Sequence, residues 1–354
     1  MQPLRPILRS PHFRLISIGA AFLLSASLLL GQSSFVSFDA PDAGTGPSQG
    51  TIPATINLKG QIAGVYIDSS NLQHGFIRQP NGQFAEFFPP SITDVVVLGL
   101  NNSGQILGTA TLPASPFDFY PFLRTPAGLY TAFAALELHP ASTIPTGINN
   151  SGHVSGYYQD GAQAFHGFLR DANGELTIID DPDANISAGS GTYALALNDD
   201  GVVAGYYGDQ ATGKPRGFTR DQFGNFTNFD VVRGSDGVVP VSINLSGQIA
   251  GEFWGANQVF YGFLRDASGV ITTFGVPGAV FTHVAGMNDS GEIAGVWSPP
   301  QQHALGYLRD SAGTITTFSV PRPNFANLIS GINNTGKITG AWEDQNYVLH
   351  GFVQ

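Results

Sequence analysis

One eight-residue pattern, Asn-x-x-Gly-x-(Ile/Val)-x-Gly, occurs seven times along this chain and limits the folds that the chain can adopt. The repeats lie 44 to 49 residues apart. A fixed period of this size predicts an array of supersecondary units that bury their apolar faces against one another. We call the first residue of the pattern the turn Asn. The seven turn Asn residues are Asn57, Asn101, Asn149, Asn198, Asn244, Asn288 and Asn333.

The sixth unit, residues 282–321, shows how one repeat is built. It contains four short apolar runs: HVAGMN, EIAGVW, ALGYLR and TITTFSV. The first two runs are joined by Asn288-Asp289-Ser290-Gly291 and the last two by Asp310-Ser311-Ala312-Gly313. Asn or Asp at the first position and Gly at the fourth are typical of a type I turn that closes a β-hairpin. Each unit is therefore predicted to be a four-stranded antiparallel meander with two tight hairpins.

Four strands in each of seven units predict an all-β fold, a seven-bladed β-propeller. The last unit stops at His350-Gly351-Phe352, before a fourth strand. Residues 35–41 (FVSFDAP) match the fourth strand of other units, such as TTFSVP at 316–321. The N-terminal strand is thus expected to complete the last blade, which closes the ring and removes two unpaired edges.

The first 33 residues differ in composition from the rest. Three arginines precede the mostly apolar stretch LISIGAAFLLSASLLL, and small residues follow it. This order is typical of a secretory signal peptide, with a retained membrane anchor as the alternative. Residues 1–33 are therefore interpreted as the leader and residues 34–354 as the propeller. Such a protein is expected to be secreted or held at the cell surface, with membrane contact only through an uncleaved leader.

Charge and cysteine content exclude several functions. Residues 34–354 carry all 26 acidic residues but 12 of the 15 basic ones, without a basic run. A nucleic-acid partner is not expected for so acidic a chain. The absence of cysteine from the sequence excludes thiolate catalysis and thiolate-bound metals.

The repeats resemble those of a known family. The stretches GINNSGHVSGYYQDGAQAFHGFLRDANGELTIID (147–180) and GINNTGKITGAWEDQNYVLHGFV (331–353) are similar to the probable extracellular repeat proteins of the HAF type. The resemblance covers residues 35–354, although His-Gly-Phe or a related tripeptide replaces His-Ala-Phe. It implies a bacterial exported repeat protein without a settled activity.

Three sets of repeated residues could carry chemistry, but each also has a structural interpretation. His74, His166 and His350 lie on different units, so strand-ordering contacts to neighbouring blades are favoured over a metal ring. Six arginines end the third run and are expected to pair locally at the hairpin base rather than bind a polyanion; they are Arg78, Arg124, Arg170, Arg220, Arg265 and Arg309. The aromatic residue nine positions after the turn Asn is expected to pack between blades, with sugar stacking as the alternative.

Variable loops offer further candidates. Phe117, Phe119, Tyr120 and Tyr347 do not repeat and are candidate ligand contacts. Asp181, Asp183 and Asn185 have a spacing that can gather oxygen ligands for Ca²⁺. The glycine and glutamate that an EF-type loop requires are missing there, so a solvated turn is the preferred interpretation, and no cofactor is assigned.

The sequence favours a non-catalytic binding or interaction module. Carbohydrate or protein is the expected ligand, bound at the face that carries the variable loops, and the chain is expected to be a monomer. Loops on a rigid scaffold are where recognition usually resides. The alternative is an extracellular polysaccharide hydrolase or lyase that uses carboxylates from these loops. No catalytic residue is assigned.

Overall fold

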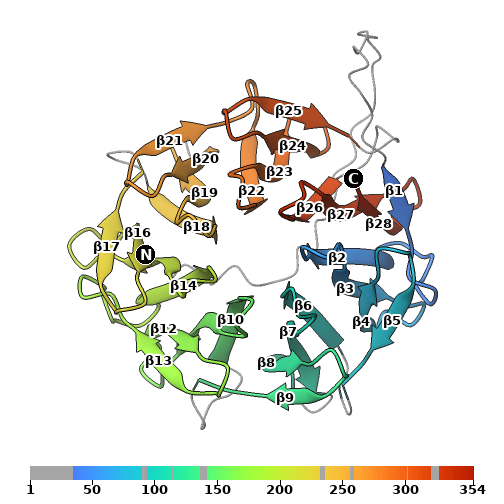
Figure 1. Ribbon diagram of the computed structural model, residues 1–354, viewed down its shortest axis with the longest axis horizontal. Coiled ribbons are helices and arrows are strands. Elements are labelled where there is room, and N and C mark those ends of the chain that lie inside the picture. The colour runs from blue at the N-terminus through green and yellow to red at the C-terminus, as the bar shows by residue number, and fades with distance from the viewer. Residues whose placement is uncertain are drawn as a thin grey trace.

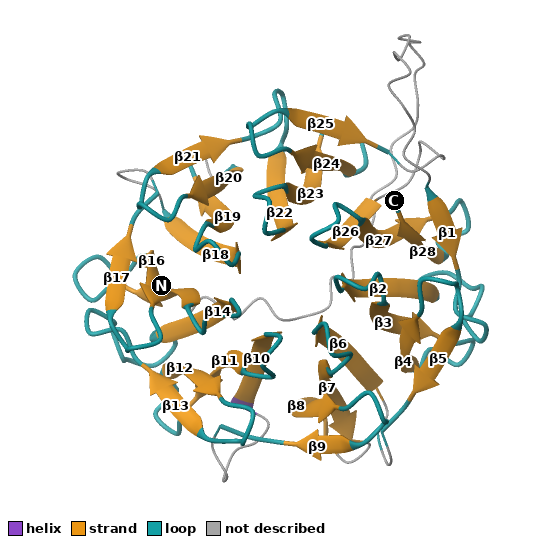
Figure 2. Ribbon diagram, in the orientation of Figure 1, coloured by secondary structure: helices purple, strands orange, loops and turns teal. Residues whose placement is uncertain are grey.

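The computed structural model describes residues 35–89, 92, 94–112, 115–135, 142–231, 236–255, 259–300, 302–319 and 327–354. Residues 1–33, which the sequence analysis interprets as a leader, lie outside this range. Strands and loops make up nearly all of the described chain (Figure 2). Within these residues, no helix is both long and apolar enough to cross a membrane.

Seven four-stranded antiparallel blades form a ring, as the repeat predicted (Figure 1). The inner strands are β2 (Gly50–Ile56), β6 (Asp94–Leu100), β10 (Thr143–Ile148), β14 (Thr192–Leu197), β18 (Gly237–Ile243), β22 (Phe281–Met287) and β26 (Asn327–Ile332). The second strands are β3 (Ile62–Ile67), β7 (Ile106–Leu112), β11 (Val154–Gln159), β15 (Val203–Gly208), β19 (Ile249–Trp254), β23 (Ile293–Ser298) and β27 (Ile338–Glu343).

The outer half of each blade has two more strands. The third strands are β4 (Gln73–Arg78), β8 (Ser115–Arg124), β12 (Phe165–Arg170), β16 (Pro215–Arg220), β20 (Phe260–Arg265), β24 (Leu305–Arg309) and β28 (Leu349–Val353). The fourth strands, at the rim, are β5 (Phe84–Phe87), β9 (Tyr130–Ala132), β13 (Leu176–Ile179), β17 (Phe226–Phe229), β21 (Ile271–Phe274), β25 (Ile315–Phe318) and β1 (Val36–Phe38). We number the blades 1 to 7 in the order of their inner strands.

The ring is closed by the N-terminal strand, as expected. β1 pairs antiparallel with β28, with Val36 opposite Val353 and Phe38 opposite Gly351. Blade 7 therefore takes three strands from one end of the chain and its rim strand from the other end. Side-chain contacts support this pairing, because the Trp342 indole N–H donates to Ser37 Oγ at 3.0 Å.

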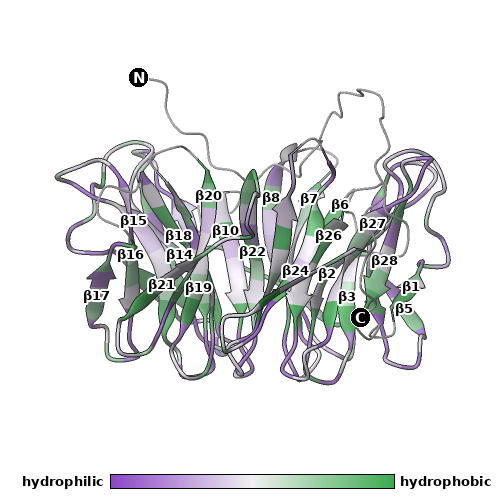
Figure 3. Cartoon of the chain, turned by 90° about the horizontal axis from the view of Figure 1, so that it is seen from above, coloured by the Kyte–Doolittle hydropathy of each residue, from purple (hydrophilic) through white to green (hydrophobic). Residues whose placement is uncertain are grey.

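Apolar side chains fill the space between adjacent blades. Val65 of β3, for example, packs with Val95 and Val97 of β6 in the next blade. In the side view, the strands run between two faces, and apolar residues concentrate along the strands (Figure 3). The hairpin turns lie on one face, which we call the hairpin face. The connections between second and third strands, and from one blade to the next, lie on the other, which we call the loop face.

The Gly seven residues after each turn Asn is required within its own blade. A side chain at Gly64 would collide with the Ile52 carbonyl oxygen of β2 and with the Phe76 ring of β4. The inner strand has a β-bulge between Pro53 and Thr55, which disturbs the regular pairing with β3 at this point. The close approach is thus made by the blade's own inner strand.

Candidate ligand-binding site

The turn Asn residues form a structural ring on the hairpin face. Asn149 Oδ1 accepts the N–H groups of Ser151 and His153, which closes the turn. Its Nδ2 donates to the Asn198 carbonyl of the next blade at 3.1 Å. All seven turn Asn residues make this link, at 2.9 to 3.4 Å, and Asn333 donates back to Asn57. A polar cavity of about 260 Å³ opens beside this ring.

The repeated histidines are held inside their own blades. His166 stacks on Tyr158, its cross-strand partner, at a ring distance of 5.2 Å. Its Nδ1 lies 2.9 Å from Asp180, which follows the rim strand, and its Nε2 lies 3.4 Å from Asp160, in the loop between β11 and β12. We call this arrangement the aspartate clamp. It corrects the expectation of contacts to neighbouring blades, because the ring lies over its strand partner.

The clamp recurs with variations around the ring. In blade 7, His350 stacks on Trp342 and pairs with Asp39. In blade 4, Arg216 replaces the histidine and pairs with Asp230 and Asp209. In blade 1, His74 pairs with Asp68 and is covered by Phe88 instead of a second aspartate, at a ring distance of 4.8 Å. In these four blades, the residue that follows the rim strand covers the side chain on the third strand.

The arginines that end the third strands pair locally, as predicted, but they also connect blades. Each guanidinium donates to the carbonyl of the next residue, at 3.1 to 3.4 Å. In five blades the guanidinium also lies over a phenyl ring at the rim of the preceding blade. These pairs are Arg78 with Phe38, Arg124 with Phe87, Arg170 with Phe133, Arg265 with Phe229 and Arg309 with Phe274.

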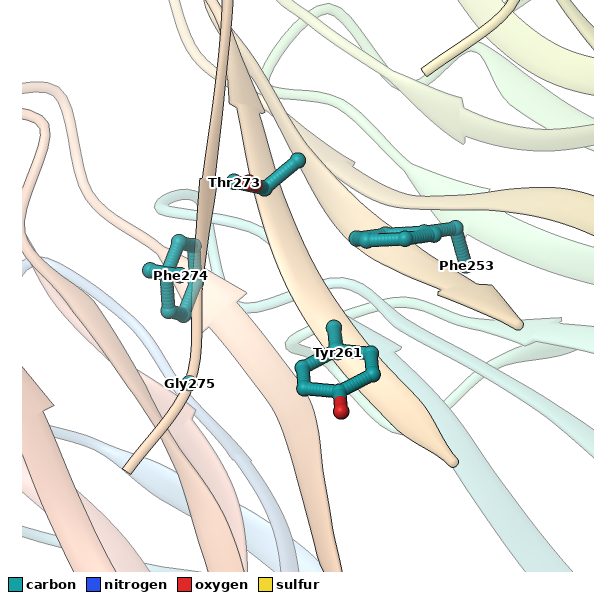
Figure 4. A pocket seen from close by; sticks show the side chains of 5 residues that line it. All are labelled: Phe253, Tyr261, Thr273, Phe274 and Gly275. Carbon is teal, nitrogen blue, oxygen red and sulfur yellow. The ribbon is translucent and has the colours of Figure 1, made fainter. Parts of the chain in front are cut away.

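Blade 5 departs from the clamp and gains a pocket. Tyr261 stands at the histidine position, and Gly275 stands where Asp180 covers the histidine in blade 3. Tyr261 stacks on Phe253 at 5.6 Å. Because Gly275 has no side chain to lie over the Tyr261 ring, a pocket of about 340 Å³ remains, lined also by Thr273 and Phe274 (Figure 4). The aromatic residue nine positions after the turn Asn, Phe253, is buried against blade 4 yet contributes to this pocket.

A second non-repeating cluster lies at the loop face between blades 5 and 6. His283 Nδ1 lies 2.8 Å from Glu252 Oε2, and Glu252 Oε1 accepts the Val284 N–H at 2.7 Å. The rings of Phe260 and Phe281 lie 4.9 and 4.6 Å from the imidazole. The His283 side chain is 36% exposed, whereas that of Glu252 is 14% exposed. A partly buried carboxylate therefore orients a solvent-accessible imidazole beside two phenyl rings.

Three tyrosines pack together between blades 3 and 4. Tyr193 stacks on Tyr206 at 4.5 Å and meets Tyr157 edge to face at 5.0 Å. Burial raises the pKa of all three phenols, and it raises the pKa of Tyr206 to about 12. These residues stay protonated at neutral pH and can donate hydrogen bonds.

The loop aromatics expected from the sequence do not form one site. Phe119 and Tyr120 belong to β8 in blade 2, and Phe119 is exposed. Tyr347 is exposed in a turn of blade 7, with its carbonyl bound to the Ser48 N–H. Blade 1 separates these two positions. The Phe117 side chain lies outside the part of the chain that the structure describes.

The calcium candidate is only partly assembled. Asn185 Oδ1 accepts the Ser187 N–H, a local turn contact. Asp181 and Asp183 both accept hydrogen bonds from Asn228 on β17, which the sequence interpretation did not include. Within the described ranges, no three His, Cys, Asp or Glu side chains gather in a way that could hold a metal ion.

The pocket and the His–Glu pair were missed by the sequence analysis, although a signal was present. Both arise where a residue breaks the repeat. Gly275 replaces a covering side chain. His283 stands five residues before its turn Asn, where five other units carry Ile, Val or Leu, and Glu252 stands eight residues after its turn Asn, where no other unit carries a charged residue. Comparing each unit with the others position by position would have found these departures.

No family model and no curated protein matches the chain. Solved structures do resemble it. A catalytically inactive histidine-to-alanine variant of virginiamycin B lyase from Staphylococcus aureus, solved with quinupristin, superposes with a TM-score of 0.61 at 13% identity, over 91% of this chain and 99% of the lyase. A streptogramin B lyase gives 0.58 at 14% identity, over 90% and 97% of the two chains.

A lectin has a similar fold as well. The BP39L lectin from Burkholderia pseudomallei superposes with a TM-score of 0.53 at 11% identity, covering 84% of this chain and 93% of the lectin. Likeness at such low identity concerns the fold alone. The chain thus has the β-propeller fold that a lyase and a lectin also use.

Proposed function

We propose that this protein is a non-catalytic module that binds carbohydrate in the blade 5 pocket. The observation that carries the proposal is the uncovered aromatic pair Phe253–Tyr261, in the position where blades 1, 3, 4 and 7 cover the third-strand side chain. The C–H face of a sugar ring packs well on an aromatic ring, while its hydroxyls need polar partners. Tyr261 and Thr273, which line the pocket, each carry a hydroxyl group (Figure 4).

The size and location of the pocket support this proposal. The pocket has a volume of about 340 Å³ and is open to solvent, which suits the face of one sugar ring rather than an enclosed small molecule. The pocket lies on the outer strands of a rigid blade, where a longer glycan can extend into solvent. The lectin that shares the fold agrees with a binding role for this type of scaffold.

The test is glycan binding by the chain that starts at Ser34. We expect saturable binding to one class of polysaccharide or cell-wall glycan, with the glycan left intact. Tyr261→Ala should weaken binding about tenfold or more, because it removes the stacking surface. A second variant, Tyr261→His with Gly275→Asp, rebuilds the clamp of blades 3 and 7 and should close the pocket without harming the fold.

Blade 6 provides the matched control. Leu305→His with Ser319→Asp makes the same change at the equivalent positions of that blade. This variant should bind as the parent does. If the blade 5 and blade 6 variants bind equally well, the pocket is not the site. If no glycan binds at all, a protein partner becomes the better proposal.

We also propose that the module works outside the cell and that it is a repeat protein of the HAF type. The leader of residues 1–33 and the repeat pattern support this assignment. Mass spectrometry of the exported protein should give a chain that starts at Ser34. Detection of the intact leader in a membrane fraction would instead indicate a retained anchor.

A lyase or hydrolase is the second candidate, favoured by the Glu252–His283 pair. An imidazole oriented by a carboxylate can act as a general acid or base near neutral pH. Both Glu252 oxygens are engaged, so the histidine would move the proton. Glycan shortening that His283→Gln abolishes, while binding persists, would establish this activity. Intact glycan with both proteins would exclude it.

A further inference from the structure

The connection between blades 3 and 4 contains a buried carboxylate that the fold itself does not require. Residues 179–192 (IDDPDANISAGSGT) align without gaps with residues 38–51 (FDAPDAGTGPSQGT), which enter blade 1. Ala40 in the first connection and Asp181 in the second are both buried, at 2% and 3% exposure. Each backbone N–H donates to the threonine that begins the next blade, Thr51 or Thr192. Asp181 thus occupies an alanine position.

Three polar atoms around Asp181 have no hydrogen-bond partner among the described residues. They are Asp181 Oδ2, Asn228 Oδ1 and the Tyr207 hydroxyl. Tyr207 is fully buried. Buried polar atoms are rarely left unpaired, because each such atom costs free energy. Blade 1 avoids this cost, since the equivalent Tyr66 donates to Glu86 at 2.8 Å.

Contacts place these atoms at one junction. Asn228 Nδ2 donates to Asp181 Oδ1 at 3.2 Å and to Asp183 Oδ2 at 3.1 Å, so it lies between the two carboxylates. Burial and the nearby charges of Asp181, Asp183 and Asp209 raise the pKa of Tyr207 to about 12, while Arg216 opposes them. The loop is fixed to this blade, because Asn185 N–H donates to the Gly208 carbonyl and Gln210 N–H to that of Asp183.

The charge at this junction is negative. Arg216 is the cation nearby, but it already pairs with Asp230 and Asp209. Asp181 Oδ1 accepts the Asp183 N–H at 2.9 Å, so the two aspartates lie close together without a dedicated positive partner. Burial and the charge of Asp183 both raise the pKa of Asp181, whereas hydrogen bonds and Arg216 lower it. A bound cation would relieve this repulsion.

We propose that Asp181, Asp183, Asn228 and Tyr207 form a site for a hard cation, Ca²⁺, that joins the loop of residues 180–191 to blade 4. These four side chains offer only oxygen ligands once the Asn228 amide is rotated by half a turn, which brings its oxygen toward the carboxylates. The rotation exchanges the amide oxygen and nitrogen and leaves the shape of the side chain unchanged. Oxygen-only sites suit Ca²⁺ and do not favour zinc or copper. The donors come from a loop and a neighbouring strand rather than from one EF-type loop.

The experiment uses the chain from Ser34, freed of divalent ions, and CaCl₂ as the probe. Isothermal titration should show one Ca²⁺ per chain, and thermal unfolding should shift to higher temperature as Ca²⁺ is added. Tb³⁺ replaces Ca²⁺ in oxygen sites, and its luminescence should be sensitised by excitation of the Tyr207 ring. Tyr207→Phe tests the hydroxyl as a ligand, because it keeps the ring while removing the oxygen.

Matched variants locate the site. Asp183→Asn should abolish the Ca²⁺-dependent shift in unfolding temperature, because it removes one of the two carboxylate charges. Asp183 is exposed, so this change should leave the fold intact. Asp42→Asn is the control, since Asp42 is its counterpart in the aligned loop that carries Ala40. Asp181→Ala restores the alanine of that loop, so it should fold and lose Ca²⁺ binding.

Two results would overturn the proposal. Absence of any heat, thermal shift or sensitised Tb³⁺ emission at millimolar ion would mean that water alone satisfies the three atoms. Equal Ca²⁺ binding by the parent, Asp183→Asn and Asp181→Ala would place the ion elsewhere. Glycan binding is not a readout in this experiment, so its outcome is independent of the blade 5 proposal.

Discussion

At the scale of single residues, the turn asparagine explains why the repeat is invariant at this position. Its side-chain oxygen accepts hydrogen bonds from its own turn, while its nitrogen donates to the next blade. Aspartate could keep the first contact but has no hydrogen to donate. Asp does occur one residue later, at Asp199 and Asp289, where the side chain accepts a backbone N–H from the preceding blade. The chemistry of the amide therefore selects the residue.

Asn149→Asp tests this account. The change should lower the free energy of unfolding by about 1–3 kcal/mol, because it removes a buried donor and sets a carboxylate against the Asn198 carbonyl. Asn102→Asp is the control, since the Asn102 side chain serves as an acceptor for the Leu58 N–H, which Asp can also be, and the equivalent positions Asp199 and Asp289 already carry Asp. Urea unfolding of both proteins gives the comparison. Equal stability of the two variants would contradict the ring of hydrogen bonds as a source of stability.

At the scale of elements, the strands could be predicted from sequence and the sites could not. For the sixth unit the four apolar runs match β22 to β25 within two residues at each end. Local turn chemistry and period-two patterns determine these strands. The Glu252–His283 contact joins side chains 31 residues apart on adjacent blades, and the blade 5 pocket depends on Gly275, which lacks a side chain. Local sequence patterns carry no information about contacts between residues that are distant in the sequence.

The rim strand β1 gives the sharpest test at this scale. Deletion of residues 34–41 removes the Trp342–Ser37 bond, the His350–Asp39 pair and the Phe38 ring under Arg78. It also leaves the outer edge of β28 unpaired. Hydrogen exchange should therefore accelerate most in β26, β27 and β28, and least in blades 3 and 4 across the ring. Uniform acceleration in all blades, or none, would contradict the closed-ring account.

At the scale of the whole molecule, the turn aspartates make stability depend on pH. Hydrogen bonds from Asn225 hold the pKa of Asp221 below its usual value, and those from Ser268 and Val270 do the same for Asp266. A lowered pKa in the folded state stabilises the fold above the unfolded pKa, and this contribution is lost as pH falls. Asp181 has a raised pKa and opposes the trend, but the lowered aspartates are more numerous.

We therefore expect the midpoint of urea unfolding to fall as the pH is lowered from about 5 to about 2. Asp221→Asn should make this dependence shallower while keeping the turn, because an amide oxygen can still accept the N–H groups of Phe223 and Asn225. The measurement is the urea midpoint against pH for both proteins. A midpoint that stays constant or rises on acidification would show that the turn aspartates do not control stability.

The antiparallel pairing of β1 with β28 has a mechanical consequence. Val36 lies opposite Val353, so the start of one strand and the end of the other leave the blade at the same point. Tension between Phe35 and Gln354 would pull these strands apart like a zipper, breaking their hydrogen bonds one after another instead of all at once. Under mechanical tension the ring would open at the β1–β28 pairing of blade 7, while the other six blades remain folded.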